Sequence, residues 1–448
     1  MGPKLLLLFI VGDILGTGIY ALTGQVAAEV GGAAWAPFLV AFAVALLTAF
    51  SYLELVTKYP RAAGAALYVH KAFGIHFLTF LVTFTVMCSG LTSASTASQA
   101  FSANMFRALG IDADPGLVTM GALGFMLLVM AINFRGVSES VKANVVLTLV
   151  ELTGLLLVIV LGFYAIAGGQ ADFSRVVAFD TPEDKSVFLA ITSATALAFF
   201  AMVGFEDSVN MAEEIKDPHR IFPKVMLSGL AITAVIYVLV SICAVALIPV
   251  GELADSDTPL VLVVERAAPG LQMDVVMPVI SMFAVANSAL INMMMASRLL
   301  YGMARQGVLP RFLSRVHARN RTPWTAILFT TALAFALIVL VSLSDSPAIR
   351  SLGGTTALLL LAVFAFVNVA VLVLRRHKVE HPHFRIPAVL PVIGAVTCLF
   401  LVTPLTGRDV IQYHVAGWLL ALGVVMWGLT LLFHRKDAGH IDPETLNE

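Results

Sequence analysis

The chain has 448 residues, of which 59% are hydrophobic and 12% are charged. Soluble globular proteins carry roughly 25% charged residues, so this composition excludes a soluble protein and predicts an integral membrane protein. The formal net charge of −1 gives no indication of a nucleic-acid partner, and the three cysteines, isolated in apolar segments, indicate neither a disulfide framework nor a zinc site.

Apolar runs of about 20 residues, the length that crosses a bilayer as a helix, recur along the whole chain. The polar stretches between them are too short for a soluble domain, so we expect a single all-α membrane domain over residues 1–448. The twelve predicted transmembrane segments are 5–29, 35–57, 76–106, 116–133, 140–168, 187–213, 225–248, 275–303, 324–343, 351–374, 389–406 and 410–433.

Basic residues are distributed unevenly between the connections. If the first segment starts in the cytoplasm, most of the 27 lysines and arginines fall in inner connections and at the termini, among them Lys216, Arg435 and Lys436. Connections rich in lysine and arginine remain in the cytoplasm. We therefore expect a multi-pass protein of the cell membrane with both termini cytoplasmic.

The first segment combines three glycines with a carboxylate, at Gly12, Asp13, Gly16 and Gly18. Glycine permits unusual dihedral angles, so the helix can come apart here, and backbone exposed at membrane depth is tolerated only where it lines a cavity. The amides of Gly16, Thr17 and Gly18 would then favour a carboxylate, and the carbonyls that end the first half would favour an ammonium group. The pattern predicts a site for a zwitterion, with close helix packing at Gly12-x-x-x-Gly16 as the alternative.

A second candidate break lies in the sixth segment, where Gly204 is followed by two carboxylates. Segment six is five segments after segment one and enters the membrane from the opposite side, so residues 5–168 and 187–374 would form inverted repeats. Interrupted helices at corresponding positions of inverted repeats indicate a transporter's substrate site near the bilayer midplane. Residues 389–433 would be two accessory helices.

Five stretches resemble signature sequences of the amino acid–polyamine–organocation permeases. They occur in order from the first segment to the end of the eighth, at residues 12–20, 59–65, 199–206, 213–218 and 298–310. The resemblance implies the leucine-transporter fold, a 5+5 inverted repeat with helices 1 and 6 broken, and secondary transport of amino acids or related amines.

The resemblance also implies which residues bind the substrate. It places the carboxylate on the amides of the first break and the amine against carbonyls of both breaks, and it suggests a pocket contact in segment eight. The implied substrate-binding residues are Ile14, Gly16, Thr17, Gly18, Phe200, Ala201, Val203 and Asn292. Interhelical hydrogen bonding is the alternative for Asn292.

Large apolar side chains flank the second break, and they could form a hydrophobic lid over the ligand. The candidates for this gating role are Phe199, Met202 and Phe205. Plain packing is the alternative, because aromatic side chains in such helices usually pack against their neighbours.

Glu151 lies in the middle of the otherwise apolar fifth segment. A carboxylate at that depth is costly unless it faces the interior, is paired or holds a proton. Related permeases often have a lysine in the corresponding part of helix five, which is thought to act in proton coupling. Glu151 is therefore our candidate for proton coupling, with a structural hydrogen bond as the alternative.

Three further carboxylates lie at the breaks. Asp13 could bind or gate cations, but we favour structural pairing. Glu206 and Asp207 could attract an amine, but we favour a role in satisfying amides at the start of the second half of segment six.

These features predict a secondary active amino acid permease that works by alternating access, and they indicate no enzyme, cofactor or metal site. The expected partners are the lipid bilayer and a zwitterionic amino acid, with a cationic amino acid or a polyamine also considered. Proton-coupled uptake is the favoured mechanism. The alternatives are sodium coupling, exchange of one amino acid or polyamine for another, and a sensor that binds substrate without moving it.

Overall fold

The computed structural model describes residues 2–61, 64–136, 141–181, 185–215, 217–344, 346–433, 441 and 443. Lys216, Arg435 and Lys436, which we expect on the cytoplasmic side, lie outside these residues. The described chain is helical, and its only pairing of extended backbone is a bridge between Gly31 and Phe179. The predicted all-α architecture is confirmed.

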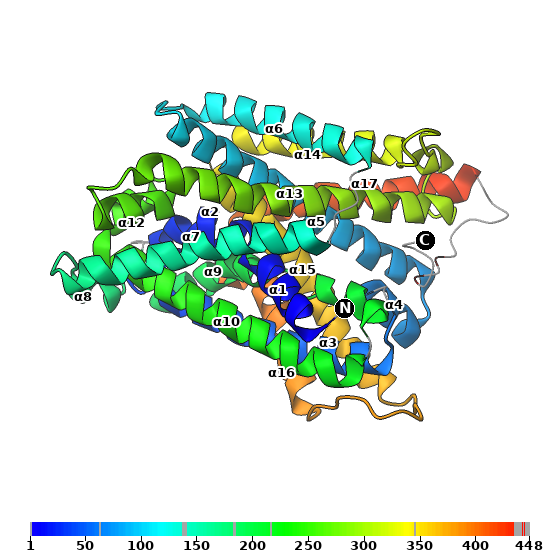
Figure 1. Cartoon of the computed structure of the whole chain (residues 1–448). Coiled ribbons are helices and arrows are strands. Elements are labelled where there is room, and N and C mark those ends of the chain that lie inside the picture. Colours follow the sequence, from blue (N-terminus) through cyan, green and yellow to red (C-terminus); the bar gives the residue numbers. More distant parts are fainter. Residues whose placement is uncertain are drawn as a thin grey trace.

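Eleven helices of the described chain are long and apolar enough to cross a membrane, judged by length and composition. The long helices run side by side as a bundle (Figure 1). The first segment consists of α1 (Pro3–Leu15) and α2 (Thr17–Val30), and the sixth of α9 (Val187–Ala198), η1 (Phe199–Met202) and η2 (Asp207–Glu214). The other nine are α3 (Trp35–Lys58), α5 (His76–Ala108), α6 (Pro115–Arg135), α7 (Val141–Ala167), α10 (Pro218–Leu247), α13 (Met273–Arg305), α14 (Trp324–Ser342), α15 (Ala348–Leu374) and α17 (Val410–Phe433).

The eleventh predicted segment is shorter than expected. It forms α16 (Val389–Val402), which has 14 residues, whereas the sequence predicted a span over 389–406. Pro404 explains the early end, because proline lacks an amide donor and disfavours helical backbone at the residue before it. Thr403 is accordingly extended, with φ −73° and ψ 155°, and Pro404 begins the short 3₁₀ helix η4 (Pro404–Thr406).

Short helices occupy several of the connections between the membrane segments. α4 (Gly64–Phe73) lies at one end of the bundle, and α8 (Phe173–Val176) and α12 (Pro259–Ala267) lie at the other (Figure 1). The remaining two are α11 (Val250–Ala254), which packs against α2, and η3 (Arg311–Ser314), which packs against α13.

A buried arginine joins the last two helices to the rest of the bundle. The Arg408 guanidinium donates to the carbonyls of Leu401, Gly354 and Ala196 and to the side-chain oxygen of Gln412, at 2.8 to 3.4 Å. Burial lowers the pKa of Arg408 to about 10, because the charged form loses its hydration. Since Ala196 lies two residues before the end of α9, Arg408 also holds the half-helix that leads into the second break.

Candidate functional site

The first segment is interrupted at Gly16, as the sequence predicted. Gly16 has φ −35° and ψ −150°, which stops the helix at Leu15, and α2 begins at Thr17 without a side-chain cap. The first amides of α2 therefore lack helical partners. On the other side of the break, the Ile14 carbonyl accepts a hydrogen bond of 2.6 Å from the Tyr237 hydroxyl of α10.

The glycines of this motif serve different purposes. Gly12 stays inside α1, where a Cβ atom would overlap the side chain of Thr148 on α7, so the close-packing alternative holds for this glycine. A Cβ atom on Gly16 would lie 2.5 Å from the Ser288 hydroxyl of α13. Glycine is therefore needed at both positions, for packing at one and for the break at the other.

The sixth segment is also interrupted. The α-helix ends at Ala198, a single 3₁₀ turn follows, Val203 is extended with ψ 150°, and Gly204 has φ +122°. Only glycine adopts that φ value without strain. The Glu206 carboxylate accepts a hydrogen bond of 2.9 Å from the Gly204 amide, which lies in the break itself, and forms no capping hydrogen bond with η2, so the amide that it satisfies precedes the second half of the segment. The second half of the segment, η2, is a 3₁₀ helix rather than an α-helix.

The two breaks contact each other through backbone. A Cβ atom on Gly18 would overlap Ala201, and one on Gly204 would lie 2.6 Å from the Asp13 carbonyl. Each interrupted segment thus presents a glycine to the other, and the absence of a Cβ atom lets the two backbones approach more closely than side chains would allow. Two interruptions separated by almost 190 residues therefore form one site.

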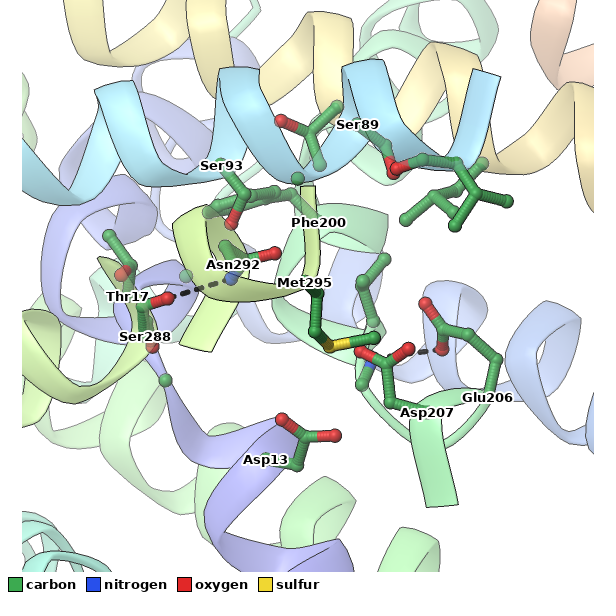
Figure 2. Close-up of a pocket in the computed structure, with 18 of the residues that line it drawn as sticks. Asp13, Thr17, Ser89, Ser93, Phe200, Glu206, Asp207, Ser288, Asn292 and Met295 are labelled. Atoms are coloured by element: carbon green, nitrogen blue, oxygen red, sulfur yellow. Dashed lines mark hydrogen bonds between the residues drawn. The ribbon is translucent and has the colours of Figure 1, made fainter. Parts of the chain in front are cut away.

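A cavity of about 60 Å³ opens beside the paired breaks, between α5, α13 and α15. Seven of the eight predicted substrate-binding residues line it: Ile14, Gly16, Thr17, Gly18, Phe200, Val203 and Asn292. Ala201 is the exception, because it packs behind the cavity wall against Gly18. Figure 2 shows Thr17, Phe200, Ser288 and Asn292 around the open space.

Two polar side chains in the cavity wall differ in their hydrogen bonding. The Thr17 hydroxyl is buried, with the residue 3% exposed, and has no hydrogen-bond partner. The Asn292 amide donates to the carbonyl of Ser288, one turn earlier on α13, at 2.9 Å, so it bonds its own helix rather than a neighbouring one (Figure 2). The cavity therefore offers an unused hydroxyl next to the free amides of α2.

Sequence reasoning did not select every residue of the wall. Thr356 and Leu360 of α15, Gly90 of α5, and Met295 and Leu299 of α13 also line the cavity. None of these five residues carries a charge or lies at a break, and the sequence analysis assigned none of them to the site. Their proximity to the site arises from the packing of α5, α13 and α15 around the breaks.

Comparison with known proteins agrees with this geometry. Residues 3–429 match the family described as amino acid permease. The chain belongs to this family, which is part of the amino acid–polyamine–organocation superfamily. Three of its relatives are 26 to 28% identical to it, and their names give different substrates.

The permease is 28% identical to the branched-chain amino acid permease BcaP of Bacillus subtilis (strain 168), over 95% of this chain and 91% of the relative. It is 27% identical to the methylthioribose transporter of the same organism, over 96% and 92%. It is 26% identical to the chloroplastic cationic amino acid transporter 7 of Arabidopsis thaliana, over 82% of this chain and 64% of that one.

Glu151 of the permease lies outside the cavity wall. It is 1% exposed on α7, and one oxygen of its carboxyl group has no hydrogen-bond partner. Its backbone carbonyl accepts a hydrogen bond of 2.8 Å from the Tyr20 hydroxyl of α2. A buried acid with unused bonding capacity next to the first broken segment can hold a proton, and proton coupling through Glu151 stays a prediction.

The three predicted lid residues of the permease do not line the cavity either. Phe199, Met202 and Phe205 are fully buried, and the rings of Phe199 and Phe205 pack against Phe364 of α15 at centroid distances of 5.9 and 5.5 Å. In this arrangement they serve as packing, which was the alternative, and their gating role stays a prediction.

A network of buried ion pairs lies beyond the cavity, at the far end of α2. Glu29 of α2 pairs with Arg350 of α15 and, at 2.8 Å, with Lys185 of the connection before α9. Arg350 also pairs with Asp409 at 2.8 Å. The side chain of Glu29 is only 4% exposed, so this network joins four separate parts of the permease where water has little access.

Proposed function

We propose that the permease takes up an amino acid by secondary active transport, with the substrate bound between the two breaks. The observation that supports this most directly is the contact between the breaks beside a cavity that they both line. The free amides at the start of α2 suit a carboxylate, because the helix dipole favours negative charge there. The carbonyls of Ile14, Phe200 and Val203 suit the amine.

The repeat architecture is part of this proposal. Family membership implies the leucine-transporter-type fold, in which residues 5–168 and 187–374 are inverted repeats and 389–433 are accessory helices. The position of the interruptions, in the first segment of each proposed repeat, supports this division.

The orientation is also a proposal. We place both termini in the cytoplasm and the protein in the cell membrane. In that orientation α4 is cytoplasmic and α8 and α12 are extracellular, which agrees with their positions at opposite ends of the bundle (Figure 1). Bacterial relatives such as BcaP support the cell membrane as the location.

The positions of the cavity and of the ion pairs support alternating access as the proposed mechanism. Asp13, Glu206 and Leu299 line the cavity, and in the proposed orientation each lies on the cytoplasmic side of its break or helix. The network around Glu29 lies on the extracellular side. The arrangement therefore corresponds to a transporter closed toward the outside, with its site directed toward the cytoplasm.

We propose protons as the driving ion and Glu151 as the group that carries them. The Tyr20 hydroxyl of α2 donates to the backbone carbonyl of Glu151, so the residue that carries this carboxyl group is in direct contact with the first broken segment. This contact supports Glu151 over the three carboxylates at the breaks, Asp13, Glu206 and Asp207, which line the cavity.

Substitution of Gly16 tests the site. A leucine at this position would fill the space next to Ser288, so we expect Gly16→Leu to abolish substrate binding while the protein remains folded. The control is Gly417→Leu on α17, where a Cβ atom meets nothing within 4 Å. Normal substrate affinity of Gly16→Leu in a thermal-shift titration, or binding equally lost in the control, would rule out the proposed site.

A further inference from the structure

Positive charge gathers around the connection between α13 and α14. Residues 275–344 contain no aspartate or glutamate, but arginines recur in the connection, and the last residues of α6 and α13 are also arginines. The connection lies at the same end of the bundle as α4 (Figure 1). Six exposed arginines, which we call the arginine surface, belong to this region: Arg135, Arg305, Arg311, Arg315, Arg319 and Arg321.

The protein itself does not compensate these charges. Within the described part of the chain, no side chain of the arginine surface forms a hydrogen bond or an ion pair. Other inner cations do have partners, because Lys58 donates to the Leu374 carbonyl at 2.6 Å and Arg375 pairs with Glu54 at 2.7 Å. Like charges that gather without an acid repel one another, and an anionic partner from outside the protein would relieve this repulsion.

Apolar side chains alternate with the arginines of the connection. Phe312 is 50% exposed and Val316 is 46% exposed, and Arg311 and Arg315 are their neighbours in the chain. Arginines mixed with exposed aromatic and aliphatic side chains are typical of segments that lie at a membrane interface, where the apolar groups reach the acyl boundary and the cations stay with the headgroups. A soluble anion would use only the charges, whereas a lipid surface uses both kinds of side chain.

The neighbouring helices place the arginine surface next to lipid. Fewer than half of the residues in the apolar membrane stretches of α6, α13 and α14 are buried, so these helices expose much of their length to the outside of the bundle. α6 and α14 pack against each other at one edge of the bundle (Figure 1). Charges at the ends of such helices lie at the level where a membrane has its headgroups.

Hydrogen bonds hold the connection against the end of α6. The Asn320 side-chain amide and the Thr322 hydroxyl both donate to the Phe134 carbonyl, at 3.0 and 3.1 Å. Between them, Arg321 has left-handed backbone with φ +55°, which residues other than glycine rarely adopt. These contacts bring the arginines of the connection to the end of the helix that carries Arg135, so the charges come from two separate parts of the chain.

We propose that the arginine surface binds the phosphate groups of anionic phospholipids, with Phe312 and Val316 inserted below the headgroups. Guanidinium groups bind phosphate oxygens in pairs, and clusters of about four to eight basic residues at the cytoplasmic end of membrane helices are typical of anionic-lipid binding. In the proposed orientation the surface faces the cytoplasmic leaflet. None of its six arginines lines the substrate cavity, so the inference goes beyond the proposed function and concerns a different site.

The experiment compares two lipids that differ in headgroup charge. The purified full-length permease in detergent is titrated with phosphatidylglycerol or phosphatidylcholine of identical acyl chains, and bound lipid is counted by native mass spectrometry. We expect phosphatidylglycerol to bind about tenfold or more tightly than phosphatidylcholine. The difference should shrink as the salt concentration rises, because salt screens exposed charges.

Variants assign the preference to the arginine surface. We expect Arg315→Gln/Arg319→Gln to lower the ratio of phosphatidylglycerol to phosphatidylcholine affinity by about tenfold, because two phosphate contacts are lost. The matched control is Arg61→Gln/Arg220→Gln, which also removes two exposed arginines, but each of these has an acidic partner at 4.0 Å. The ratio should be unchanged in the control.

A second variant, Arg305→Gln/Arg311→Gln, should lower the ratio in the same way and keeps the test available if the first variant does not fold. Equal affinity of the wild type for the two lipids, or an equal loss of preference in the control, would overturn the proposal. Displacement of bound phosphatidylglycerol by inorganic phosphate, beyond the effect of sodium chloride at equal ionic strength, would also overturn it, because the surface would then bind a soluble anion. The proposed function at the substrate cavity would stand in each of these cases.

Discussion

The Tyr237 hydroxyl donates a hydrogen bond of 2.6 Å to the Ile14 carbonyl, one of the backbone groups exposed by the first break. The helix cannot satisfy this carbonyl, because the chain is no longer helical at Gly16. Tyr237 therefore fixes the position of the carbonyl and leaves its second lone pair for a ligand. A side chain of α10 thus maintains the geometry of a site on α1.

Removal of this hydroxyl should weaken the site. We expect Tyr237→Phe to lower stability by about 1–3 kcal/mol, because the Ile14 carbonyl remains buried without its partner. Substrate affinity should fall at the same time, measured by thermal-shift titration. The control is Tyr68→Phe, which removes a buried hydroxyl that has no hydrogen-bond partner. Equal effects of the two substitutions would contradict the role of Tyr237.

The second break depends on Gly204 for a different reason. Its φ of +122° is strained for any other residue, and a Cβ atom would lie 2.6 Å from the Asp13 carbonyl. We expect Gly204→Ala to cost about 1–3 kcal/mol from backbone strain alone and to separate the two breaks, so that binding is lost. The lipid-facing substitution Gly417→Ala is the control, and its binding should be unchanged. Wild-type affinity in Gly204→Ala would show that the contact between the breaks is not required.

Both breaks could be predicted from the sequence because they have local causes. Three glycines beside Asp13 in one apolar run, and Gly204 beside two carboxylates in another, mark the breaks without any knowledge of packing. The amides of Gly16, Thr17 and Gly18 followed from the first break, whereas the resemblance to the permeases supplied the other predicted binding residues. The rings of Phe199 and Phe205, which we considered as part of a lid, pack against Phe364 in this structure, a long-range contact that the local sequence does not reveal.

Long-range contacts could not be predicted in this way. Nothing in the sequence near Tyr237 connects it with Ile14, and nothing near Glu29 indicates that it pairs with Arg350, more than 300 residues later. Such contacts depend on how the helices pack, which the apolar pattern leaves undetermined. The short α16 is an intermediate case, because Pro404 is visible in the sequence but the apolar pattern alone continues past it.

Glu151 provides a test of ion coupling. If this carboxyl group carries the driving proton, uptake by the wild type should increase as the external pH falls, and Glu151→Gln should flatten that dependence. Glutamine keeps the size of the side chain but cannot exchange a proton. Uptake into proteoliposomes with and without a pH gradient measures the effect. An unchanged pH profile in Glu151→Gln would remove this residue from the coupling mechanism and leave the structural role.

The ion pairs around Glu29 provide a test of the outer gate. Glu29 accepts from both Arg350 and Lys185, so Glu29→Gln weakens two pairs at once in a place that water scarcely reaches. Removal of one partner from a buried ion pair is costly because the other charges remain buried, and this cost falls on the form that is closed toward the outside. We therefore expect the equilibrium between this form and the outward-open form to shift toward the outward-open form by about tenfold. A cysteine introduced at Ser93, in the cavity wall, should then react faster with a membrane-impermeant thiol reagent added outside the cell. Glu265→Gln is the matched control, because the Arg107–Glu265 pair is exposed and contributes little. Equal labelling rates in both variants would mean that the Glu29 network does not hold the outer side closed.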